Sequence, residues 1–247
     1  MTSRTLTASR SVMDATLPFA MPIGLSAFLL FSVEPLVGRL VLPVFGGTPA
    51  VWATTLFFFQ AVLLLGYLYG HLSVTLLGRY GPPVHLALAA LALYMLINAP
   101  SQISALRNDA TTPVIDLIGI LIAIIGLPAF VLTTTTPLLS GWFHAAREEE
   151  QGDPYWLYAL SNAGSLLALL AYPILVEPRI GLSTQRGVWA VGFVGLVVLI
   201  AWAGLRAMPD LARRARPSES YAPAYAVAST ATAAPAVDAI DWPRRLR

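Results

Sequence analysis

Long apolar stretches dominate this chain and limit what it can fold into more than any other feature. Six stretches approach or exceed the roughly 20 apolar residues that a helix needs to cross a bilayer. They cover residues 17–43, 49–77, 84–99, 113–143, 154–176 and 187–205. Only 11% of the 247 residues are charged, against roughly 25% in soluble domains. The sequence therefore predicts an all-α, polytopic integral membrane bundle of about six spans.

Several classes of function are excluded by what the sequence lacks. All 15 basic residues are arginine, the formal charge is only +2, and no basic stripe with interleaved aromatics suggests a nucleic-acid partner. The absence of cysteine excludes disulfides, thiolate catalysis and Cys-ligated metals. No phosphate-binding glycine loop or nucleophile elbow is present, so we expect no cofactor and no enzymatic activity in this chain. His71, His85 and His144 have an arbitrary spacing, so no metal site is expected.

Composition divides the chain into three parts. Residues 1–16 form an N-terminal segment, and residues 17–206 form the transmembrane domain. Residues 207–247 form a tail that is rich in Ala and Pro beyond Pro217 and carries few large apolar residues. Such a segment buries too little apolar surface to offset its ordering entropy. We therefore predict a largely disordered tail.

The distribution of arginine predicts the orientation. If the N-terminus is cytoplasmic, eight of the twelve arginines up to Arg216 lie in cytoplasmic segments and four in outer segments. The cytoplasmic arginines would be Arg4, Arg10, Arg79, Arg147, Arg206, Arg213, Arg214 and Arg216, and the outer ones Arg39, Arg107, Arg179 and Arg186. The positive-inside rule then favours both termini in the cytoplasm. We expect the membrane to be a bacterial inner membrane.

The tripeptide Val-Glu-Pro occurs twice, at Val33–Pro35 and Val176–Pro178, with Arg39 and Arg179 close behind. A carboxylate in a membrane segment is costly to desolvate, so it marks a charge pair or a site. We expect Glu34 and Glu177 to approach each other at the outer ends of spans one and five, within reach of the two arginines. Two interpretations stay open: a site for a polar or cationic ligand, and structural ion pairs that join two spans.

Other polar and helix-breaking residues predict kinks and close packing. Pro35 and Pro137 break the helical hydrogen-bond pattern, and the threonines that end at Thr136 can satisfy freed carbonyls. Small residues in span five favour close approach of helices; they include Ser161, Asn162, Gly164 and Ser165. Thr48–Pro49 and Asp153–Pro154 are typical of helix starts.

A faint internal similarity links the first half of the domain to the second. Glu34–Gly38 resembles Thr136–Ser140, and a tryptophan follows each proline at a similar distance, Trp52 and Trp156. This similarity is consistent with a 3+3 inverted repeat, an arrangement typical of transporters.

Several longer segments resemble the membrane domain of fused transporter/spermidine-synthase-like proteins. They are Phe31–Pro43 with Gly46–Trp52, Leu132–Ser140, Tyr155–Ser165 and Tyr172–Pro178, and the resemblance covers residues 17–205. It implies a helical membrane domain that an aminopropyltransferase-like domain follows. The chain carries no glycine-rich loop for an adenosyl substrate, so that activity is not expected here.

The leading functional prediction is a stand-alone membrane domain of this kind with a transport or polar-ligand-binding role. Its candidate site consists of Glu34, Arg39, Glu177 and Arg179. Two alternatives stay open: a structural or accessory subunit of a larger membrane complex, and the membrane half of a split enzyme. The expected partners are the lipid bilayer, other membrane subunits and a separately encoded soluble domain.

Overall fold

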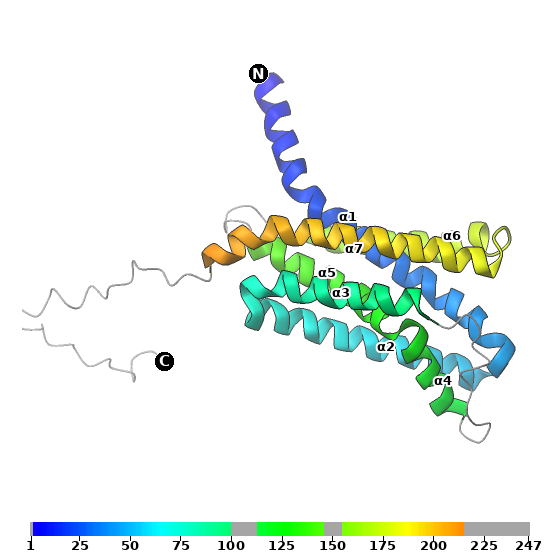
Figure 1. The fold of residues 1–247 in the computed structure, drawn as a ribbon. Coiled ribbons are helices and arrows are strands. Elements are labelled where there is room, and N and C mark those ends of the chain that lie inside the picture. Colours follow the sequence, from blue (N-terminus) through cyan, green and yellow to red (C-terminus); the bar gives the residue numbers. More distant parts are fainter. Residues whose placement is uncertain (1, 100–112, 146–154, 215–247) are drawn as a thin grey trace, which may run out of the picture. The chain divides into compact units, whose positions relative to one another are not determined.

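The computed structural model describes residues 2–99, 113–145 and 155–214, and within these ranges every regular element is a helix (Figure 1). The α-helices are α1 (Thr2–Phe45), α2 (Pro49–Leu72), α3 (Gly81–Ile97), α4 (Pro113–Leu121), α5 (Leu127–Ala145), α6 (Tyr155–Ala171) and α7 (Leu182–Arg214). Short π or 3-10 segments are η1 (Ser73–Leu77), η2 (Gly78–Tyr80), η4 (Ile122–Gly126) and η5 (Tyr172–Val176). The prediction of an all-α membrane bundle is confirmed.

Five continuous helical stretches among the described residues are long and apolar enough to cross a membrane. They are Thr16–Phe45, Pro49–Ile97, Pro113–His144, Trp156–Val176 and Leu182–Arg213. The second has 49 residues and would be about 74 Å long as one straight helix, far more than a bilayer of about 30 Å can hold. Gly78, with φ +47°, reverses the chain between α2 and α3. This stretch therefore contains two of the six expected spans, and α3 is the short one.

The expected helix boundaries can be compared with the structure at the start of α2 and at the end of α7. Thr48 caps α2, with its Oγ1 accepting from the Val51 N–H at 3.4 Å, and Pro49 is the first helical residue, as predicted. Asp153, the second predicted cap, lies outside the described residues. The final helix α7 continues to Arg214, beyond the predicted last span at 187–205. The rest of the predicted tail also lies outside the described residues.

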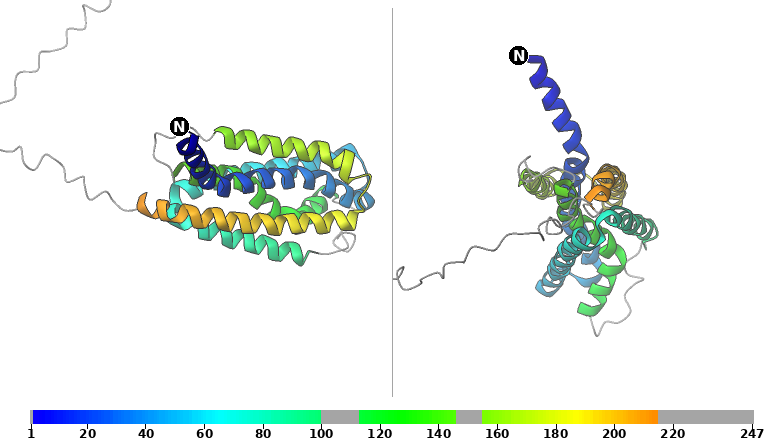
Figure 2. Two further views of the ribbon diagram at one scale, coloured as in Figure 1. Left: turned by 90° about the horizontal axis from the view of Figure 1, so that it is seen from above. Right: turned by 90° about the vertical axis from the view of Figure 1, so that its left-hand side faces the viewer.

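Helices α1 and α5 occupy the central positions of the bundle (Figure 2). Helix α1 packs against α5, α6 and α7, and α5 also packs against α2, α3 and α7. We call the end where α1 ends and α7 begins the Glu177 end. The opposite end, where α2 turns into α3, is the Gly81 end.

Pro35 and Pro137 do not end the helices that contain them. Pro137 leaves the Thr133 carbonyl without its helical N–H donor. The neighbouring hydroxyls, however, bond one turn earlier: Thr134 and Thr135 both donate to the Val131 carbonyl, at 2.8 and 2.7 Å. The threonines therefore satisfy the backbone before the proline and not the carbonyl that the proline frees.

Candidate functional site

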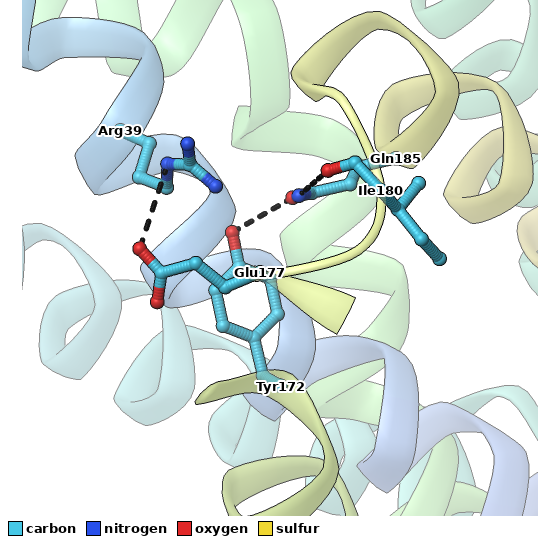
Figure 3. A network of polar contacts seen from close by, with 5 residues as sticks. All are labelled: Arg39, Tyr172, Glu177, Ile180 and Gln185. Carbon is cyan, nitrogen blue, oxygen red and sulfur yellow. Dashed lines mark hydrogen bonds and ion pairs between the residues drawn. The ribbon is translucent and has the colours of Figure 1, made fainter. Parts of the chain in front are cut away.

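The structure brings two of the four predicted charged residues together, Arg39 of α1 and Glu177 at the end of η5 (Figure 3). Arg39 Nε lies 3.7 Å from Glu177 Oε1, and the two side chains are 38% and 46% exposed. An ion pair this accessible contributes only about 0–1 kcal/mol to stability. The pair joins α1 to the turn that leads into α7, but it does not form a buried charge site.

Hydrogen bonds beside this pair fix the turn between η5 and α7 (Figure 3). Tyr172 donates its hydroxyl to Gln185 Oε1 at 2.9 Å, and Gln185 Nε2 donates to the Ile180 carbonyl at 2.6 Å. Arg179 donates to the Ile174 carbonyl, and within the described residues it forms no ion pair with either glutamate. Arg179 therefore belongs to the turn and not to the predicted charge cluster.

Glu34 lies deeper than the sequence predicted. Helix α1 continues for 11 residues beyond it, to Phe45, so Glu34 is about 16 Å from the helix end at 1.5 Å per residue. Among the residues that the structure describes it has no ion-pair partner, and its side chain is half-buried. The expected joint site of two glutamates and two arginines at one level is therefore not formed within these residues.

A cavity of about 350 Å³ lies between α1, α2, α5 and α6. Its polar wall consists of Tyr67, Thr133, Thr136, Ser161, Asn162 and Ser165. Four of these residues were predicted only as kink or packing residues, and Tyr67 and Thr133 were not predicted as site residues. The available signal was a spacing of three or four between polar residues on each helix, which places them on one face.

Hydrogen bonds position the hydroxyls of this cavity. Thr136 Oγ1 lies 3.3 Å from Ser161 Oγ, which links α5 to α6, and Ser165 donates to the Ser161 carbonyl at 3.0 Å. Thr133 Oγ1 lies 2.9 Å from the Phe130 carbonyl and 3.3 Å from the Val62 carbonyl of α2. Thr133 and Ser165 each donate their proton to a carbonyl, and one hydroxyl of the Thr136–Ser161 pair donates to the other, so the oxygens of these hydroxyls keep acceptor capacity for a ligand.

Glu34 does not line this cavity, but its position in α1 places it on the helix face that does. Ala27 and Phe31 of α1 line the cavity, and residues at spacings of four and three share a helix face. Glu34 follows Phe31 by three residues, so it lies on the same face, one turn nearer the Glu177 end. A carboxylate with no ion pair among the described residues thus adjoins a hydroxyl- and amide-lined cavity.

A second cavity, of about 390 Å³, lies nearer the Gly81 end, between α2, α5 and α6. Its lining includes His71, Ser140 and Tyr158, and it shares Tyr67 with the first cavity. Tyr67 therefore forms a wall between two adjoining cavities.

The predicted packing residues in α6 do allow close approach of helices. A Cβ on Gly164 would lie 2.5 Å from the backbone oxygen of Gly24 in α1, so any larger residue would force the two helices apart. Gly66 and Gly70 of α2 lie in the same way against Thr133 and Pro137 of α5. Small residues on α2 were not part of the prediction, although their spacing of four is the same signal.

Comparison of the chain with protein-family models, with curated proteins and with solved structures gave no match. The fold defines the chain as a multi-pass, all-α integral membrane protein. Within the described residues no group of three His, Asp or Glu side chains is placed to hold a metal ion.

Proposed function

We propose that this protein binds a small polar, preferentially cationic solute in the cavity between α1, α2, α5 and α6, as a transporter or ligand-binding membrane protein. The observation that carries this proposal is a cavity with six polar lining residues that is open at the bundle surface, where Tyr67 and Asn162 are exposed, together with Glu34 on the adjoining turn of the same α1 face. Polar and charged groups within membrane spans are costly, and they commonly mark the path of a substrate or an ion.

The chemistry of the wall favours a cation or an amine. The hydroxyl oxygens of Thr133, Thr136 and Ser165 accept hydrogen bonds from an ammonium group. Glu34 supplies negative charge, and within the described residues no ion pair joins it to Arg39. The resemblance of residues 17–205 to transporter/spermidine-synthase-like membrane domains agrees with a solute of this kind.

Cysteine accessibility tests the proposal without knowledge of the ligand. The chain has no native cysteine, so Ser165→Cys provides a single thiol in the cavity. In lipid nanodiscs, trimethylammonium and sulfonate methanethiosulfonate reagents of similar size would be compared by intact-protein mass spectrometry. We expect the cationic reagent to react at least about tenfold faster, because a charged cleft concentrates counter-ions to that degree.

Two variants control this experiment. Leu167→Cys lies on the exposed apolar face of the same helix and should react slowly with both reagents. Glu34→Gln in the Ser165→Cys background should abolish most of the preference for the cation. If Ser165→Cys reacts no faster than Leu167→Cys, the cavity is closed to polar solutes and the proposal is wrong.

A structural subunit is the second candidate, because α6 exposes a large apolar surface. Leu166, Leu167 and Leu170 are 58%, 60% and 53% exposed, and Asn162 is exposed between them and the start of the helix. An amide facing lipid is unfavourable, so a partner helix on α6 would stabilise it. Native mass spectrometry of the intact membrane complex would reveal such a partner, and a soluble catalytic partner there would instead favour the split enzyme.

A further inference from the structure

A group of buried polar atoms near the Gly81 end has no hydrogen-bond partner within the described residues outside the group itself, where the Tyr69 and Ser73 hydroxyls interact with each other. The atoms are Tyr69 Oη, Ser73 Oγ, both ring nitrogens of His85 and Trp142 Nε1. His85, Ser73 and Trp142 are 0%, 2% and 1% exposed. Buried polar groups in proteins are nearly always satisfied, by other protein groups or by ordered water. Five such atoms from α2, η1, α3 and α5 therefore require a common explanation.

These side chains lie close to one another. The rings of Tyr69 and His85 have centroids 5.8 Å apart, and those of His85 and Trp142 are 6.2 Å apart. A Cβ on Gly81 would lie 3.4 Å from both Ser73 Oγ and Trp142 Nε1, so these two atoms converge over the glycine. Tyr69 and Ser73 are four residues apart and thus share a helix face. The contacts form a closed ring of four side chains, which we call the His85 loop; the name refers to this ring of contacts and not to a segment of the chain.

We infer that the His85 loop is a binding site for ordered water. Trp142 can only donate, the two hydroxyls can donate and accept, and a neutral imidazole does one of each. A neutral ligand that donates and accepts equally well matches this set, and water makes about three such bonds in buried sites. The loop contains no carboxylate, and hard cations prefer oxygen ligands such as carboxylates and carbonyls. Water is therefore the chemical class that the loop fits.

A second buried tryptophan, Trp189, can be compared with Trp142 in the same chain. Trp189 is 6% exposed, and its Nε1 donates to the Leu29 carbonyl at 2.9 Å. Its indole N–H is thus buried like that of Trp142 but satisfied by protein. The inference does not depend on the proposed function, because none of the four loop side chains lines the cavity beside Glu34.

Nuclear magnetic resonance of the full chain in lipid nanodiscs tests the inference. The protein would be labelled with [15N]tryptophan, and magnetisation transfer from water to each indole N–H would be recorded. The Trp142 signal is assigned by its loss in Trp142→Phe, and the Trp189 signal by its loss in Trp189→Phe. We expect a cross-peak of a long-lived bound water at Trp142 and none at Trp189. Absence of the cross-peak at Trp142, or a cross-peak to lipid protons in its place, overturns the inference.

A glycine variant then locates the water. Gly81→Val adds methyl groups over Ser73 Oγ and Trp142 Nε1 and should remove the cross-peak. Gly195→Val, whose Cβ would have no neighbour within 4 Å, should retain it. Retention of the cross-peak in a folded Gly81→Val protein would place the water elsewhere and contradict the His85 loop. If Gly81→Val does not fold, the comparison of Trp142 with Trp189 in the native protein decides the question alone.

Discussion

Glu34 and Glu177 have the same neighbours in the sequence, yet they occupy different structural settings. Val33–Pro35 lies inside a continuous helix, whereas Val176–Pro178 ends one. The cause lies in the residues that follow. Leu36, Val37 and Val41 are buried in the core, so packing holds α1 together past its proline. After Glu177 the chain is exposed and no such packing opposes the break.

At residue scale, the sequence predicted a cluster of four charged residues, and within the described residues only Arg39 and Glu177 of these pair. The pairing of Arg39 with Glu177 depends on how far α1 continues past Glu34. That length depends on tertiary packing, which a tripeptide does not encode. The cavity was missed for a similar reason, because its wall combines residues from four helices whose neighbours were unknown.

The Arg39–Glu177 pair should show weak coupling in a double-mutant cycle. With Arg39→Gln, Glu177→Gln and the double variant, we expect a coupling of about 0.2–1 kcal/mol, because both side chains are well exposed. The measurement is thermal or denaturant unfolding in a fixed detergent. Arg179→Gln, which affects only a bond to the Ile174 carbonyl, is the matched control and should show no coupling to Glu177→Gln. A coupling of about 3 kcal/mol or more would indicate a buried pair and contradict this geometry.

Glu34 and Arg39 should behave independently. They are five residues apart on one helix, about 7.5 Å along its axis, and no ion pair joins them among the described residues. The effects of Glu34→Gln and Arg39→Gln on stability should therefore add to within about 0.5 kcal/mol. A larger non-additivity in the same unfolding assay would restore the charge cluster that the sequence suggested.

At the scale of elements, close packing of α1 and α6 was predictable in kind but not in partner. Gly164 was predicted from its small neighbours to face another helix. The sequence did not indicate that this helix is α1, or that the contact is with the backbone of Gly24. The spacing of small residues in a sequence indicates which face of a helix carries them. Which two such faces pack against each other is seen only in the assembled bundle.

Gly164→Ala should destabilise the bundle by about 1–3 kcal/mol, because the new methyl group overlaps a backbone oxygen that cannot turn away. Gly195→Ala is the control, since its Cβ would meet no atom within 4 Å. That variant should be neutral or stabilising by up to about 1 kcal/mol, the usual effect of Gly→Ala in a helix. Denaturant unfolding of both variants measures the difference. Equal stabilities would mean that α1 and α6 are not in this contact.

At the scale of the whole molecule, the hydropathy pattern predicted the helical membrane bundle. Five continuous helical stretches in the described residues are candidate spans, and the count of six requires the turn at Gly78 to divide the second of them. Each of the six apolar stretches corresponds to a helix or a run of helices. The orientation, the inverted repeat and the domain boundaries stay predictions. The positions of the helices alone do not show how the bundle is oriented in the bilayer. They also do not show whether its two halves have a common evolutionary origin.

Single cysteines test the orientation. Thr48 and Arg79 are exposed and lie at opposite ends of the α2–α3 pair. With both termini cytoplasmic, Thr48→Cys should react with an impermeant maleimide added outside intact cells, and Arg79→Cys should react only after permeabilisation. The reverse pattern would contradict the arginine-based orientation.

The turn at Gly78 also has a consequence for how the protein is made. Only the short segment Ser73–Tyr80 separates α2 from α3, so the two helices must enter the bilayer as a hairpin during synthesis. Helix α3 has 17 residues and is about 25 Å long, slightly less than the hydrocarbon core. If this hairpin failed to form, α3 would stay outside the bilayer. The spans formed by α4 to α7 would then insert with inverted orientation. The fidelity of the whole topology in newly synthesised protein therefore depends on one glycine and one marginal span.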